Sequence, residues 1–165
     1  HKKLIVDTDV FSDVEYIFPF YSYYHPAPFK PLLFADHALI PLSDAGALLL
    51  AATLPDITLL AVTVNVQSSY SALAVSAILG HYGHPNVPIG LRRPITNEHF
   101  FDSRGYVLGE FASKVAYNWQ GGSLRWDRPE DAWEPVELYR KVLSEEEDGS
   151  VTVASVGFLE NVRLT

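Results

Sequence analysis

Short apolar runs alternate with segments of helical periodicity along this chain of 165 residues. Strands that alternate with helices form parallel sheets, because right-handed crossover connections bring each strand back beside an earlier one. We therefore expect an α/β fold, an open parallel sheet with helices on both faces. The predicted strands cover 2–9, 57–66, 87–91 and 150–156, and the predicted helices cover 44–54, 69–82, 110–117 and 129–147.

Length and composition exclude several classes of protein. A chain of this size builds one domain with a sizeable core. The net charge of −8 has the wrong sign for a general nucleic-acid binder, and no apolar run is long enough for a membrane span. The absence of Cys removes disulfide scaffolds, thiolate zinc sites and Cys nucleophiles, but it leaves the cellular compartment open. The chain begins at His1 and contains no Met, which suggests a trimmed or incomplete product.

The segment 15–43 does not fit the strand and helix pattern. It contains eight aromatic residues and five prolines, with no period of a helix or a strand. Prolines at this density prevent a long helix or a central strand, and strand-to-helix loops usually have about 2–6 residues. Two interpretations remain open, a functional lid or foreign sequence.

Two acidic residues end the first predicted strand. Asp7 and Asp9 follow the apolar run of that strand, and Val156 ends the last one. Ligands of open parallel sheets bind beyond the carboxyl ends of the strands. The sequence therefore predicts a site that includes these three positions.

The segment 4–14, joined directly to 44–50, resembles the opening motif of the inosine/uridine-preferring nucleoside hydrolases, an Asp-x-Asp followed by an Asp-Asp-Ala. The segments 61–63 and 151–157 resemble the next two landmarks of that family, and the likeness is strongest to fungal members. It implies a Rossmann-like nucleoside hydrolase core that is incomplete, since it stops about halfway along a full-length member. Residues 1–165 would then be a single partial domain, interrupted by an insertion at 15–43.

The resemblance implies a calcium site and a reaction. It assigns Asp9 as both a Ca²⁺ ligand and the base that accepts the proton of the attacking water. It assigns Asp44 and the backbone carbonyl of Val156 as further ligands, and Asp7 would orient this group without touching the ion. Ca²⁺ suits such a site because it takes 6–8 oxygen ligands. The reaction is hydrolysis of the N-ribosidic bond of purine or pyrimidine nucleosides, a step of nucleoside catabolism and purine salvage.

The substrate residues match the family pattern less closely. Asp13 and Glu15 stand nearest to the ribose-binding Asp of the family, which is absent here, and Ser68 takes the place of a family Asn, with Asn65 and Gln67 nearby. The later half of a full-length family member, which supplies the last calcium ligand and the contacts to the leaving base, is also missing. The resemblance therefore implies a nucleoside as the partner, with no nucleic acid and no membrane. Full-length members form homo-oligomers, but this chain alone is expected to be inactive.

Codon arithmetic suggests an origin for the insertion. If a Glu15 codon GAG and a Ser43 codon AGC are split by an intron that begins at GT and ends at AG, the remaining bases join to GAC, an Asp codon. The product would read Asp13-Val14-Asp-Asp44-Ala45, which restores the family motif. We therefore hypothesise that 15–43 is a retained intron. An abundant mature transcript that keeps these codons would refute the hypothesis.

Two other functions fit parts of the pattern. Haloacid-dehalogenase-like phosphatases also follow a strand with Asp-x-Asp, and Asp7 would then be the nucleophile. Against this, Phe11 occupies a position where that family has Thr or Val. A non-enzymatic, truncated remnant of a hydrolase is the other alternative.

Overall fold

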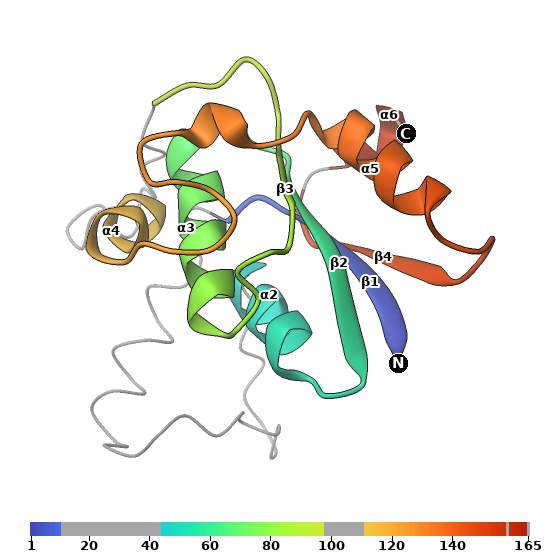
Figure 1. Cartoon of the computed structure of the whole chain (residues 1–165). Helices are drawn as coiled ribbons and strands as arrows, with labels where there is room; N and C mark the ends of the chain where they lie inside the picture. Colours follow the sequence, from blue (N-terminus) through green and yellow to red (C-terminus); the bar gives the residue numbers. More distant parts are fainter. Residues whose placement is uncertain (11–43, 98–110, 158, 165) are drawn as a thin grey trace, which may run out of the picture.

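The computed structural model describes residues 1–10, 44–97, 111–157 and 159–164. Four strands form one sheet in which every neighbouring pair is parallel, in the order β3-β2-β1-β4 (Figure 1). The strands are β1 (Lys2–Thr8), β2 (Ile57–Val64), β3 (Ile89–Leu91) and β4 (Val151–Ser155). This order is that of the first four strands of a doubly wound α/β sheet. The predicted fold class, an incomplete Rossmann-like sheet with helices, is confirmed.

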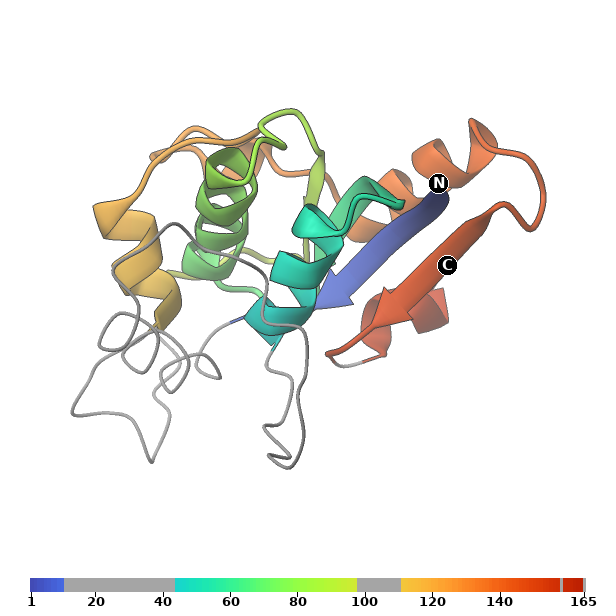
Figure 2. The same cartoon turned by 90° about the horizontal axis from the view of Figure 1, so that it is seen from below.

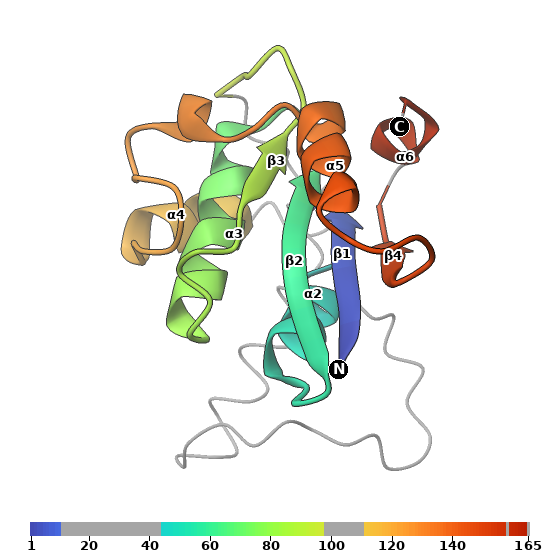
Figure 3. The same ribbon diagram turned by 45° about the vertical axis from the view of Figure 1, so that its right-hand side comes forward.

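Helices cover both faces of the sheet. The helices α2 (Asp44–Thr53) and α3 (Ser69–His81) lie on one face, and α5 (Pro135–Ser144) lies on the other (Figures 1 and 3). A further helix, α4 (Phe111–Asn118), packs against α3, as the view from below also shows (Figure 2). The short α6 (Glu160–Leu164) follows β4. None of the helices among the described residues is long and apolar enough to cross a membrane.

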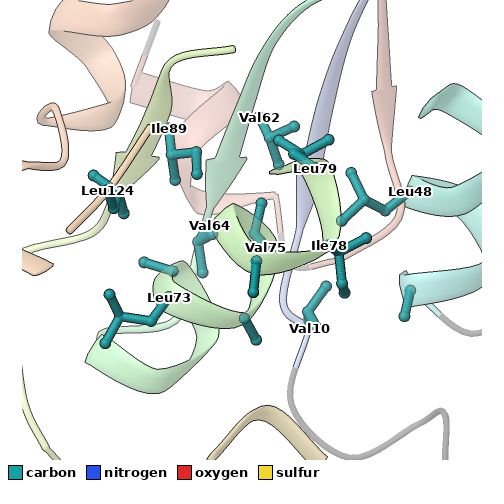
Figure 4. Packing of buried hydrophobic residues seen from close by; sticks show 14 of the residues in the cluster. Val10, Leu48, Val62, Val64, Leu73, Val75, Ile78, Leu79, Ile89 and Leu124 are labelled. Carbon is teal, nitrogen blue, oxygen red and sulfur yellow. The ribbon is translucent and has the colours of Figure 1, made fainter. Parts of the chain in front are cut away.

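The alternation of side chains along the strands builds two cores. Val62 and Val64 of β2 face α2 and α3, where they pack with Leu48, Val75 and other apolar residues (Figure 4). The intervening positions of β2 face α5 and form a smaller cluster with residues of β1 and α5 (Ile5, Ala61, Leu138, Tyr139 and Val142). Because successive strand residues point to opposite faces, a central parallel strand must be apolar on both sides. This requirement explains the continuous apolar runs in the sequence.

The predicted helix 129–147 is wrong in its first half. The structure has a short 3₁₀ helix at Pro129–Asp131, and α5 begins only at Pro135. The intervening Trp133 is extended and pairs with β3: its N–H donates to the Ile89 carbonyl and its carbonyl accepts from the Leu91 N–H, both at 2.9 Å. A proline suits the first position of a helix, where its missing N–H is not needed. The helix therefore starts afresh at Pro135.

The other predicted elements are found with small shifts at their ends. β2 ends two residues before the predicted strand 57–66 does, and β3 begins two residues after the predicted start of the strand 87–91. The described α2 begins at Asp44, as predicted, and ends at Thr53. The insertion predicted at 15–43, and with it the intron hypothesis, lies outside the described residues.

Candidate functional site

The strand order reverses between β1 and β4, and this reversal creates a natural binding position. The chain builds outward from β1 through β2 to β3 and then returns to place β4 on the other side of β1. In sheets of this kind, ligands bind in the crevice beyond the carboxyl ends of the strands at such a point. Asp7 of β1 pairs in register with Ser155 of β4, so both strands end at the same level. Asp9 and Val156 therefore both lie at the carboxyl ends of β1 and β4, a position called the crevice edge because of this general rule.

The Asp7 carboxylate is the centre of a buried hydrogen-bond network. Its side chain is fully buried, and both of its oxygens accept hydrogen bonds. Oδ1 accepts from the Thr63 hydroxyl at 2.6 Å and from the Asn161 amide at 2.9 Å. Oδ2 accepts from the Asn65 amide and the Ser155 hydroxyl, both at 3.4 Å. Four donors from β2, β4 and α6 thus converge on one carboxylate of β1.

Burial and hydrogen bonding act on the Asp7 carboxyl group in opposite directions. Burial raises its pKa above the ordinary value, because the charged form loses its hydration. The hydrogen bonds, from Thr63 first and Asn161 second, lower the pKa, but they do not outweigh the effect of burial. A carboxylate that is this enclosed can orient neighbouring groups. It has no open face toward a substrate.

Asp9 lies at the crevice edge beside the backbone of β4. Its side chain is half-buried, in contrast to that of Asp7. A Cβ placed on Gly157 would lie 2.9 Å from the Asp9 nitrogen and 2.6 Å from the Asn65 amide nitrogen. The two chain segments are therefore in close contact, and only a glycine fits at 157. The Val156 N–H donates to the Asp7 carbonyl at 2.8 Å, which holds this segment against β1.

Asp44 lies at the N-terminus of a helix that packs against β1 and β2. It is the first residue of α2, and 5% of its surface is exposed. Val10, which follows Asp9, and Ala45, which follows Asp44, belong to the same buried cluster. Asp9 and Asp44 thus each precede a residue of this cluster.

The structure changes the interpretation of the predicted substrate residues. Ser68 is 2% exposed and precedes α3, and its backbone pairs with Thr96. Asn65, and not Ser68, reaches the centre of the crevice edge, because its side chain contacts Asp7. The predicted positions Asp13 and Glu15 lie outside the described residues.

The predicted calcium ligands share one chemistry, since every donor is an oxygen. Oxygen ligands of this kind, two carboxylates and a backbone carbonyl, suit Ca²⁺ in type but fall short of the 6–8 oxygens that the ion takes. Among residues 1–10, 44–97, 111–157 and 159–164, no three His, Cys, Asp or Glu side chains come together as a metal-binding group. The calcium site therefore stays a prediction.

Sequence reasoning missed most of the partners of Asp7. Thr63 sits inside an apolar strand and Tyr139 inside an amphipathic helix, so both look like ordinary core residues. Asn161 lies close to the end of the chain and has no motif around it, yet it is 3% exposed. The one available signal was the polar residues Thr63 and Asn65, within and just after the apolar part of this strand.

Tyr139 extends the network to α5. Its hydroxyl lies 3.2 Å from the Thr63 hydroxyl, and 2% of the residue is exposed. Burial raises its pKa to about 12, the charge of Asp7 acts in the same direction, and the hydrogen bond to Thr63 opposes them. The folded protein therefore holds the phenolic proton more tightly than the unfolded chain does.

Alkaline pH is expected to destabilise the protein through Tyr139. Because the unfolded-state pKa is about 10 and the folded-state pKa is about 12, this contribution to stability is intact below about pH 10 and is lost as the pH rises toward 12. The full loss corresponds to up to about 2.7 kcal/mol, at 1.36 kcal/mol per pKa unit. Urea unfolding at about pH 9 and about pH 11 should show a smaller alkaline loss for Tyr139→Phe than for the wild type. The exposed Tyr117→Phe is the control, and an equal alkaline loss in all three proteins would contradict the assignment.

Comparisons with known proteins return no match: no family model, no curated protein and no solved structure matches this chain. The resemblance to nucleoside hydrolases therefore depends on the motifs of the sequence itself.

Proposed function

We propose that this chain is a nucleoside hydrolase core whose crevice edge at β1 and β4 binds Ca²⁺ and the ribose of a nucleoside. One observation supports the proposal more than any other: the segments on the two sides of the switch point pack so closely that a Cβ on Gly157 would lie 2.9 Å from the Asp9 backbone nitrogen. The motif residues of two segments distant in the sequence thus meet where α/β sheets bind ligands.

The proposed reaction requires a base, a cation and a shaped crevice. Bound Ca²⁺ would hold the attacking water and the ribose hydroxyls and favour loss of a proton from that water. The half-exposed Asp9 carboxylate would accept this proton, while Asp44 and the Val156 carbonyl would hold the cation. Asp7 would keep the Val156 segment in place through its buried hydrogen bonds. The resemblance assigns these roles, and the half-buried Asp9 and the fully buried Asp7 are compatible with them.

The burial of Asp7 favours this proposal over a phosphatase. A phosphatase of the haloacid-dehalogenase type would need Asp7 to attack a phosphorus atom directly. The Asp7 side chain is fully buried, and both oxygens already accept hydrogen bonds. A buried, fully bonded carboxylate is well suited to orienting other groups and poorly suited to nucleophilic attack.

Cation binding provides the first test. Luminescence of Tb³⁺, a Ca²⁺ analogue, should detect weak binding to the wild-type chain, and Ca²⁺ should displace it. Asp9→Asn is expected to weaken the binding by about tenfold or more, because the site loses a charged oxygen ligand. The matched control is Asp56→Asn, an exposed carboxylate beside Lys2 at the opposite end of the sheet. Equal binding by the wild type and Asp9→Asn would contradict the proposed cation site.

Nucleoside turnover provides the second test. The chain of 165 residues is expected to release no ribose from inosine or uridine with Ca²⁺, because its described residues supply too few oxygen ligands. A variant in which one Asp replaces 15–43 restores the Asp-Asp pair and should bind Tb³⁺ more tightly. Ribose release by the wild-type chain would refute the expected inactivity. Failure of the replacement to tighten binding would count against the role given to that pair.

A further inference from the structure

A chain of buried hydroxyl groups connects α5 to the centre of the crevice edge, and the proposed reaction does not use it. The Tyr139 hydroxyl lies 3.2 Å from that of Thr63, which in turn donates to Asp7 Oδ1 at 2.6 Å. Thr63 is fully buried and Tyr139 almost so. Buried polar groups of this kind need their partners, because an unpaired one loses its hydration without compensation.

The Thr63 hydroxyl lies between Asp7 and Tyr139. It donates to Asp7 Oδ1 at 2.6 Å, the shorter of its two contacts. Its contact with the Tyr139 hydroxyl oxygen is longer, at 3.2 Å, and holds the Thr63 side chain from the side of α5. Tyr139 therefore orients the Thr63 hydroxyl, and the Thr63 hydroxyl orients Asp7.

Asp7 transmits this orientation to the segment that contains Val156. Its side chain accepts from Ser155 and Asn161, and its backbone carbonyl accepts from the Val156 N–H. Ser155, Val156 and Asn161 are thus each hydrogen-bonded to Asp7 of β1. Gly157 lies between these attachments, against the Asp9 nitrogen.

We propose that Tyr139 and Thr63 are positioning residues, which act through Asp7 to hold residues 155–157 and Asn161 in register with Asp9. The importance of that register for cation binding rests on the proposed function, whereas the hydrogen-bond chain itself does not. Neither residue touches a substrate in this role. Their effect is to keep Asp7 in one rotamer.

Hydrogen–deuterium exchange of the segment 155–162 tests the proposal without any ligand. Thr63→Val keeps the shape of the side chain but removes the hydroxyl, and it should speed exchange in this segment by about tenfold relative to amides of α3. Thr63→Ser retains the hydroxyl and should restore wild-type exchange. Tyr139→Phe should give a smaller acceleration in the same segment, because Thr63 can still donate to Asp7.

A control variant separates positioning from general loss of stability. Val142→Ala on α5 removes apolar contacts from the same small cluster and leaves the hydroxyl chain intact. It should speed exchange without preference for 155–162. If Thr63→Val gives the same pattern as Val142→Ala, or if Thr63→Ser fails to restore slow exchange, the positioning role is refuted.

Different results would refute the positioning role and the proposed cation site. A local acceleration in Thr63→Val supports positioning even when Asp9→Asn binds Tb³⁺ as well as the wild type does, an outcome that contradicts the cation site alone. If both the positioning and the cation site hold, Thr63→Val should also weaken Tb³⁺ binding, while Val142→Ala should not at a temperature where it is folded. Uniform exchange in Thr63→Val refutes the positioning role whatever the cation result.

Discussion

Asp7→Ala is expected to lower the free energy of unfolding by about 3–5 kcal/mol. The substitution removes the one acceptor on which Thr63, Asn65, Ser155 and Asn161 converge in a buried position. Buried donors without an acceptor lose their hydration and gain nothing in return. Urea unfolding monitored by circular dichroism measures the change.

Two further variants make this result interpretable. Asp9→Ala removes a half-exposed carboxylate two residues away and should cost less than about 1 kcal/mol. Asp7→Asn keeps the shape of the side chain but presents an amide nitrogen to the donors on one side. Its cost should therefore lie between those of Asp7→Ala and Asp9→Ala. It also gives a folded variant to measure if Asp7→Ala does not fold. If Asp7→Ala costs no more than Asp9→Ala, the buried network does not stabilise the fold as described.

Gly122→Ala is expected to cost about 2–5 kcal/mol, because it combines an unfavourable backbone conformation with a steric clash. Gly122 has φ of +82°, and a Cβ at this position would lie 2.0 Å from the Ser76 carbonyl oxygen in the middle of α3. The Ser76 hydroxyl also donates to the Gly121 carbonyl at 2.8 Å and accepts from the Leu124 N–H at 3.0 Å. The loop therefore cannot move away from α3 without breaking these bonds.

Gly83→Ala is a matched control for this prediction. Gly83 has φ of +86°, nearly the same backbone conformation, but a Cβ there would have no neighbour within 4 Å. It should therefore cost only the conformational part, about 1–2 kcal/mol. Thermal or urea unfolding of the two variants compares them directly. Equal losses would show that the contact of Gly122 with Ser76 can relax.

Local patterns in the sequence predicted the elements that depend on local forces. The strand at Ile57–Val64 and the helix at Ser69–His81 follow from runs and spacings that any chain segment shows by itself. The helix predicted over 129–147 is present only from Pro135 to Ser144, because Trp133 pairs with β3, a contact between segments that are distant in the sequence. Local periodicity contains no information about such pairing.

The candidate site was likewise predicted only in part. Asp7 and Asp9 were identified from their position after an apolar run, and the sheet places both at the carboxyl edge, as predicted. Their separate environments were not predictable, because Asp7 is hydrogen-bonded to Asn161 and, through Thr63, linked to Tyr139, and both of these residues come from helices late in the chain. Ser68 was predicted as a substrate residue from the resemblance, with Asn65 nearby, and the contact of the Asn65 side chain with Asp7 is one that spacing alone does not predict.

The sequence by itself determined the alternation of strands and helices, the parallel sheet and the acidic end of β1, because these depend on periodicities within about ten residues. Only the tertiary structure decided that β4 lies beside β1, that the backbone at Gly157 packs closely against that of Asp9, and that four side chains donate hydrogen bonds to Asp7. The physical reason is that strand order and burial arise when distant segments pack to remove apolar surface from water, and this packing assigns each polar side chain either a partner or solvent.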